Sequence, residues 1–85
     1  MRRWVTSEPY RSIVRALVQA RLAQGLSQRE LARRLAKPPS FVAKIEQGER
    51  RVDVLEFIAI ARCLGIQPAD LFAAIENGLP ESFDI

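Results

Sequence analysis

Two adjacent prolines, Pro38 and Pro39, constrain the fold of this chain more than any other residues. They separate two short helical patterns inside the stretch LSQRELARRLAKPPSFVAKIEQGER, residues 26–50. Because a proline has no backbone N–H and disfavours a helical conformation in the residue before it, no single helix can include both patterns. The sequence therefore predicts two short helices joined by a tight turn, residues 28–35 and 39–47, with Pro39 at the first position of the second.

Capping residues mark the ends of five predicted helices, and no segment shows the alternation of a β-strand. Ser27 and Glu30 have the spacing of a capping box, so the first short helix begins at Gln28. Gly48 ends the second short helix by accepting a positive φ. The other three helices are expected at residues 8–24, with Ser7 as the cap, from Asp53 to Gly65, and from Pro68 to near Gly78.

Apolar residues at helical spacing identify the faces that should point into a shared core. Ala32 is small enough for the two short helices to cross closely at that position. The residues expected to face inward are Leu31, Leu35, Val42 and Ile45 in the short helices, Ile13, Leu17, Ala20 and Arg21 in the first helix, Leu55, Ile58, Ala59 and Leu64 in the fourth, and Leu71 and Ile75 in the fifth.

Length and composition predict one all-α domain, because 85 residues enclose a single core and 48% of them are apolar. We expect this domain at residues 8–78, with an N-terminal arm at 1–7 and a C-terminal tail at 79–85. One cysteine, Cys63, and no histidine argue against a disulfide framework, a metal site, a cofactor and an acid–base couple for catalysis. The sequence shows no membrane-spanning run and no secretory leader, which predicts a cytoplasmic protein.

Charge is divided unevenly along the chain. Residues 1–51 carry 12 of the 13 basic and 4 of the 10 acidic residues, a balance of +8, whereas residues 52–85 have a balance of −5. This division favours a polyanion bound by the first half, with the second half left for the core or a partner. The alternative, that these charges only solvate helix faces, does not require such a division.

The outer face of the predicted helix 39–47 combines small, uncharged and cationic side chains. Such a face can approach the major groove of DNA and donate hydrogen bonds to base acceptors, whereas an acidic face would be repelled by phosphate. The residues expected to face the bases are Pro39, Ser40, Ala43, Lys44 and Gln47.

The stretch GLSQRELARRLAKPPSFVAKIEQGERRVDVLEFIAIARCLGI resembles the Cro/C1-type (XRE-family) helix-turn-helix of bacterial and phage repressors, over roughly residues 11–75. The resemblance implies a compact five-helix, lambda-repressor-like bundle that binds double-stranded DNA, usually as a homodimer on a two-fold operator. The elements that carry it are Leu26-Ser27-Gln28, Glu30-Leu31-Ala32, Ile45-Glu46 with Gly48, and Ala61 with Leu64-Gly65.

The resemblance also assigns roles to single residues. It implies that Gln28 and the segment after Gly48 contact phosphates, and that Ser40, Ala43 and Lys44 face base edges. It further implies a buried ion pair between Arg21 and Glu46, which would explain why an arginine interrupts an apolar stripe. The alternative for Arg21 is a surface side chain that covers apolar neighbours with its aliphatic part.

Further residues are expected beside the DNA backbone. Arg50 and Arg51 form a candidate phosphate clamp, the alternative being an exposed pair without a partner. Arg29 is expected to flank the backbone unless it is only solvated. Phe41 is placed at the same edge, with packing against the core or contact with a thymine methyl group as alternatives.

The turn between the short helices departs from the family pattern. Ala36 stands where glycine is common, and if the backbone there needs a positive φ, alanine destabilises the fold by about 1 kcal/mol. Pro38 and Pro39 replace a polar cap and a base-reading side chain. Base recognition is therefore expected to shift onto Ser40, Lys44 and Gln47.

The main hypothesis is a DNA-binding transcription regulator, a repressor that inserts helix 39–47 into the major groove of a short palindromic operator. One alternative is an antitoxin or restriction–modification controller that holds a protein partner through residues 52–85. Another is a protein-interaction module that does not bind DNA. Arg2 and Arg3 in the arm either reach a groove or stay clear of it. Four apolar residues either fold back on the domain or, as we favour, form a dimer surface: Trp4, Leu79, Phe83 and Ile85.

Overall fold

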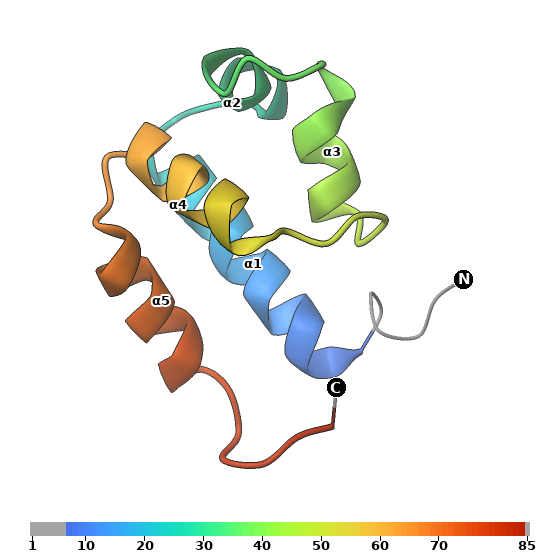
Figure 1. Ribbon diagram of the computed structural model, residues 1–85, viewed down its shortest axis with the longest axis vertical. Coiled ribbons are helices and arrows are strands. Elements are labelled where there is room, and N and C mark those ends of the chain that lie inside the picture. Colours follow the sequence, from blue (N-terminus) through green and yellow to red (C-terminus); the bar gives the residue numbers. More distant parts are fainter. Residues whose placement is uncertain (1–6, 85) are drawn as a thin grey trace.

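The computed structural model describes residues 7–84 and confirms the all-α fold expected from the sequence. The predictions for Arg2, Arg3, Trp4 and Ile85 lie outside the described residues. No strand occurs between residues 7 and 84, and no single helix there is long and apolar enough to cross a membrane. The helices are α1 (Glu8–Ala23), α2 (Gln28–Arg34), α3 (Ser40–Glu46), α4 (Val54–Cys63) and α5 (Pro68–Asn77) (Figure 1).

Side-chain caps start three of the helices where the sequence predicts them. Ser27 begins α2 by accepting a hydrogen bond from the Glu30 N–H at 3.0 Å. The Glu30 carboxylate does not complete the capping box, because it binds arginines of its own helix. A complete box starts α4, where Asp53 accepts from the Glu56 N–H at 2.7 Å and Glu56 accepts from the Asp53 N–H at 3.1 Å. Ser7 caps α1 as Ser27 caps α2, but its hydrogen bond, accepted from the Tyr10 N–H, is longer at 3.4 Å.

The two prolines lie at the end of the turn between α2 and α3, directly before α3 begins. Pro39 has a helical backbone, with φ −55° and ψ −29°, but it is the N-cap residue, so α3 begins one residue later than predicted. The Pro38 carbonyl accepts a hydrogen bond from the Phe41 N–H at 2.9 Å. At the other end, Gln47 is the C-cap and Gly48 has the positive φ of 79° that the sequence predicts.

The core lies between α1, α4 and α5 and is closed at one end by α2 and α3 (Figure 1). Ala32 and Ala61 are completely buried, which lets the helices that carry them approach their neighbours closely. The other members of the core cluster are Leu17, Leu31, Val42, Ile45, Ile60, Leu64, Leu71 and Ile75.

The inward face predicted for α4 is largely wrong. Leu55 is 76% exposed, and the helix instead turns Ile60 and Ala61 into the core, with Phe57 packed beside them. Nearly every side chain of VLEFIAIARC is apolar, so two different faces satisfy the helical period and periodicity cannot choose between them. Of the predicted set Leu55, Ile58, Ala59 and Leu64, only Leu64 is fully buried.

Ala36 lies in the left-handed region, with φ 57°, and is the one non-glycine residue with a positive φ between residues 7 and 84. The turn needs this conformation because the next residue, Lys37, donates its N–H back to the Ala32 carbonyl at 3.0 Å. A Cβ atom is disfavoured in this conformation, so Ala36 stores strain in the turn.

We therefore expect Ala36→Gly to raise the free energy of unfolding by about 1 kcal/mol, which is roughly 4–8 °C in melting temperature. Thermal and urea unfolding followed by circular dichroism would measure the change. The control is Ala59→Gly on the exposed side of α4, which should lower stability by about 1 kcal/mol because helix interiors disfavour glycine. If both substitutions lowered stability, the claim that Ala36 is strained would be wrong.

Candidate nucleic-acid interface

The outer face of α3 is a ridge held up by a buried inner face. Val42 and Ile45 are 3% and 2% exposed, and they fix the rotation of the helix against the core. The opposite side therefore faces solvent and carries no carboxylate. We name this surface the α3 ridge: Pro39, Ser40, Lys44 and Gln47, which are exposed, and Ala43, which is half-buried.

A buried ion pair ties α1 to the end of α3. Arg21 donates to both carboxylate oxygens of Glu46, from Nε to Oε2 at 2.7 Å and from Nη2 to Oε1 at 3.0 Å. Its Nη1 donates to the Leu26 carbonyl at 2.7 Å. Both side chains are almost fully buried, at 10% and 8% exposure. Arg21 is thus placed in the core and not in the surface position that was its alternative.

Gln28 belongs to the same cluster. Its Nε2 donates to Glu46 Oε1 at 2.7 Å, so the first residue of α2 is also fixed to the end of α3. An amide group has two N–H donors, and the second remains for another acceptor. The predicted phosphate contact of Gln28 would therefore have to share the amide with Glu46.

Arg50 binds a partner that the sequence does not indicate. Its Nη1 and Nη2 donate to the two oxygens of Glu56 at 2.8 and 2.7 Å. Its guanidinium also lies over the Phe41 ring, 4.9 Å from Cζ to the ring centroid, and Lys37 Nζ lies 5.4 Å from the same centroid. Phe41 is half-buried against the core, which agrees with the packing alternative.

The charges of this cluster reinforce one another. The hydrogen bond from Arg50 holds the pKa of Glu56 below its ordinary value, against the effect of burial, and the same bond raises the pKa of Arg50. Glu56 therefore stays ionised across the neutral range and keeps its hold on the guanidinium.

Arg51 points to a different helix from Arg50. Its Cζ lies 4.9 Å from the centroid of the Tyr10 ring, and the Tyr10 hydroxyl accepts a hydrogen bond from the Val52 N–H at 3.2 Å. Burial raises the pKa of Tyr10, so its hydroxyl stays protonated at neutral pH. The loop between α3 and α4 is thus attached to α1 through Tyr10, to α3 through Phe41 and to α4 through Glu56.

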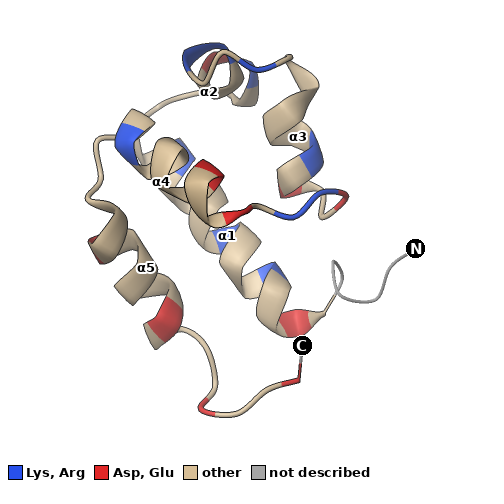
Figure 2. Ribbon diagram, in the orientation of Figure 1, with Lys and Arg blue, Asp and Glu red and all other residues tan. Residues whose placement is uncertain are grey.

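The remaining basic residues lie beside this surface. Arg29 is exposed on α2, while Arg33 and Arg34 of the same helix bind the Glu30 carboxylate. Exposed pairs of this kind contribute little to stability, so these arginines mainly supply positive charge. Figure 2 shows basic segments on α2, the following turn, α3 and the loop to α4, with some acidic segments among them, whereas the charged segments of α5 and the tail are all acidic.

Sequence patterns missed two residues that shape this surface. Glu56 is recognisable only as part of a cap, because nothing in the spacing between residues 50 and 56 predicts a paired guanidinium. Tyr10 is 42 residues from the Val52 N–H that it accepts. Both contacts depend on the course of the loop, which local patterns do not determine.

A short helix whose exposed face carries no carboxylate, presented by a helix-turn-helix with basic residues around it, defines a small DNA-binding domain. A family model described as "Helix-turn-helix" matches residues 17–71, most of the chain. The chain belongs to the Cro/C1-type (XRE) helix-turn-helix family of DNA-binding transcription regulators.

Solved structures agree with this assignment. An XRE-family like protein from Pseudomonas syringae pv. tomato str. DC3000 is 43% identical, with a TM-score of 0.78, and the match covers 85% of this chain and 88% of that one. The clp gene regulator ClgR from Corynebacterium glutamicum has the same fold at 22% identity, with a TM-score of 0.73 and coverage of 87% and 95%. Among curated proteins, none matches this chain.

Proposed function

We propose that this regulator is a cytoplasmic repressor that binds a short palindromic operator with the α3 ridge in the major groove. The observation that carries the proposal is the fixed orientation of α3, whose inner face is buried while Ser40, Lys44 and Gln47 are exposed. Lys44 is suited to guanine acceptors and Gln47 to adenine, whereas Ala43 and Pro39 offer apolar contact to a thymine methyl group.

Phosphate contacts on either side of the ridge would supply most of the affinity. The second amide N–H of Gln28, the exposed Arg29 and the guanidinium of Arg51 are the groups best placed for them. Such contacts release counterions, so the affinity should fall steeply as salt is raised.

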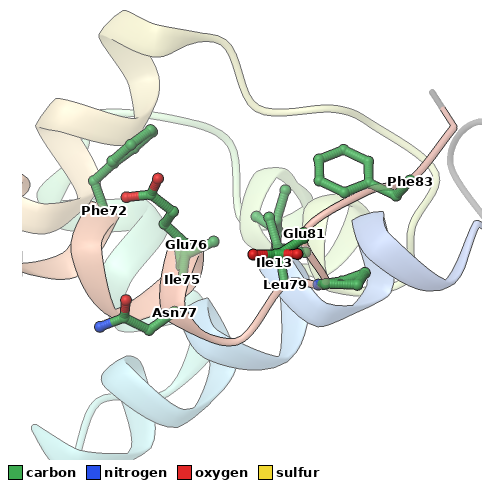
Figure 3. A pocket seen from close by; sticks show the side chains of 9 residues that line it. Ile13, Phe72, Ile75, Glu76, Asn77, Leu79, Glu81 and Phe83 are labelled. Atoms are coloured by element: carbon green, nitrogen blue, oxygen red, sulfur yellow. The ribbon is translucent and has the colours of Figure 1, made fainter.

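A homodimer would place two α3 ridges in successive major grooves, about 34 Å apart on one side of the duplex. Its interface would lie on the apolar surface formed by the start of α4 and by α5, where Val54, Leu55 and Phe72 are exposed. This surface continues into a hollow of about 740 Å³ between α5 and the tail, lined by Phe72, Leu79 and Phe83 among others (Figure 3). Leu79 packs back on the core, and Phe83 stays 44% exposed. The alternative is that a partner protein, and not a second copy of the chain, binds this apolar surface.

Selection of binding sites from random duplex DNA, followed by titration at two salt concentrations, tests this function. A symmetric selected site with half-sites one helical turn apart would support the dimer and the operator. An asymmetric site, with a purified chain that sediments as a monomer, would favour a protein partner over the homodimer. Binding that is absent, or insensitive to salt, would overturn the proposal.

Lys44→Ala should weaken binding to the selected site by about 5- to 150-fold, the value of one good base contact. The affinity for random duplex should fall far less, because no specific base contact is made there and the variant loses only one positive charge. Arg62→Ala is the matched control, since Arg62 carries the same charge as Lys44 and is exposed in the last turn of α4, outside the α3 ridge. Equal losses on selected and random DNA would remove Lys44 from base recognition.

A further inference from the structure

The guanidinium of Arg50 is already bound in the way in which arginine binds phosphate. Both terminal nitrogens face the two Glu56 oxygens, at 2.8 and 2.7 Å, in a bidentate pair. Carboxylates and phosphates accept from the same fork of N–H donors. Glu56 therefore occupies the position in which two phosphate oxygens would be bound.

From this geometry we infer that Glu56 withholds Arg50 from the DNA backbone and so limits the affinity of the protein for any duplex. The inference rests on the proposed function, because it concerns the same surface. The inference gives Arg50 a structural role within the protein, and it makes Glu56 the positioning residue that keeps Arg50 there.

The burial of Glu56 and two further contacts of Arg50 explain why Arg50 does not exchange its partner for phosphate. The side chain of Glu56 is only 16% exposed, so its carboxylate would lose a charged donor in a poorly solvated position. Arg50 also donates to the Arg51 carbonyl at 2.8 Å and covers the ring of Phe41. Leaving Glu56 would break all of these contacts, whereas one exposed phosphate would replace a single pair.

The isosteric variant Glu56→Gln tests the inference. Its amide oxygen can still accept the Asp53 N–H, so the cap of α4 is kept, but the charge that holds Arg50 is lost. We expect tighter binding to random duplex at low salt and a log–log salt slope steeper by about 0.9, the value for one additional phosphate. Between 50 and 200 mM salt this corresponds to an extra loss of about 3.5-fold in affinity.

Two controls separate this effect from a change in net charge or in folding. Asp70→Asn makes the same charge change at an exposed position in the first turn of α5, outside the residues that line the hollow beside the tail, and should leave the slope unchanged. The double variant Glu56→Gln/Arg50→Gln should return the slope to the wild-type value, because the released guanidinium is gone. Melting curves establish that each variant is folded at the titration temperature.

Arg50→Gln gives a second test that does not require Glu56 to be changed. The wild-type slope should persist, as it should in Arg62→Gln, whereas a residue that contacts phosphate would lower the slope by about 0.9. A wild-type slope in Glu56→Gln, or a lowered slope in Arg50→Gln, overturns the inference and leaves the proposed function intact. Wild-type protein that binds duplex DNA without salt dependence overturns both.

Discussion

Arg21→Ala should lower the free energy of unfolding by about 3–5 kcal/mol, because it leaves a buried carboxylate without its charged partner. Glu46 would keep only the amide of Gln28 as a donor, and the Leu26 carbonyl would lose the Arg21 Nη1 donor. A domain of this size has only a few kcal/mol of net stability, so much of the variant should be unfolded at 25 °C.

Urea unfolding followed by circular dichroism would measure this loss. Arg15→Ala is the matched control, since Arg15 binds Glu8 with both side chains mostly exposed and should contribute less than about 1 kcal/mol. Replacing the pair together, with Arg21→Met and Glu46→Leu, should cost less than Arg21→Ala alone, because no charge is then left unpaired. An unchanged melting curve for Arg21→Ala would contradict a structural role of the ion pair.

Ile45→Ala should lower the free energy of unfolding by about 2–5 kcal/mol, the usual range for a large aliphatic residue truncated in a core. Ile45 is the largest fully buried side chain among the described residues. Its removal would leave a cavity beneath α3, on the side that fixes the rotation of the ridge. DNA binding should fall in parallel with the folded fraction.

Leu22→Ala is the control for this truncation. Leu22 is also a large aliphatic residue in a helix, but it is 54% exposed and lies outside the proposed dimer surface, so the change in stability should stay within about 0.5 kcal/mol. Thermal and urea unfolding of both variants give the comparison. Similar losses for the two variants would show that burial of Ile45 does not anchor α3.

Both predictions concern the same property of the domain, the orientation of α3. Arg21 and Gln28 fix its last residue through Glu46, and Ile45 fixes its inner face. An exposed ridge that is rigidly supported keeps its side chains in place before DNA arrives, which lowers the entropy lost on binding. Variants that loosen these anchors should therefore weaken base recognition as well as stability.

Local sequence determined where the helices begin and end. Ser27, Asp53 and Pro68 act on backbone groups within three residues of themselves, so their effect does not depend on the rest of the fold. The inner face of α3 was predictable for a similar reason: Val42 and Ile45 are the apolar residues at helical spacing in a helix whose other side is polar.

Only the tertiary structure decided which face of α4 is buried and which partner Arg50 binds. Periodicity cannot select a face when nearly all side chains are apolar, so packing against α5 and α2 made the choice. The pairing of Arg50 with Glu56 depends on the path of an irregular loop, which is attached to the Phe41 ring of α3 and, by a contact 42 residues apart in sequence, to Tyr10 of α1. Helix caps and helical spacing depend only on residues that are neighbours in sequence. The buried face of α4 and the pairing of Arg50 are decided only when the helices and the loop pack together.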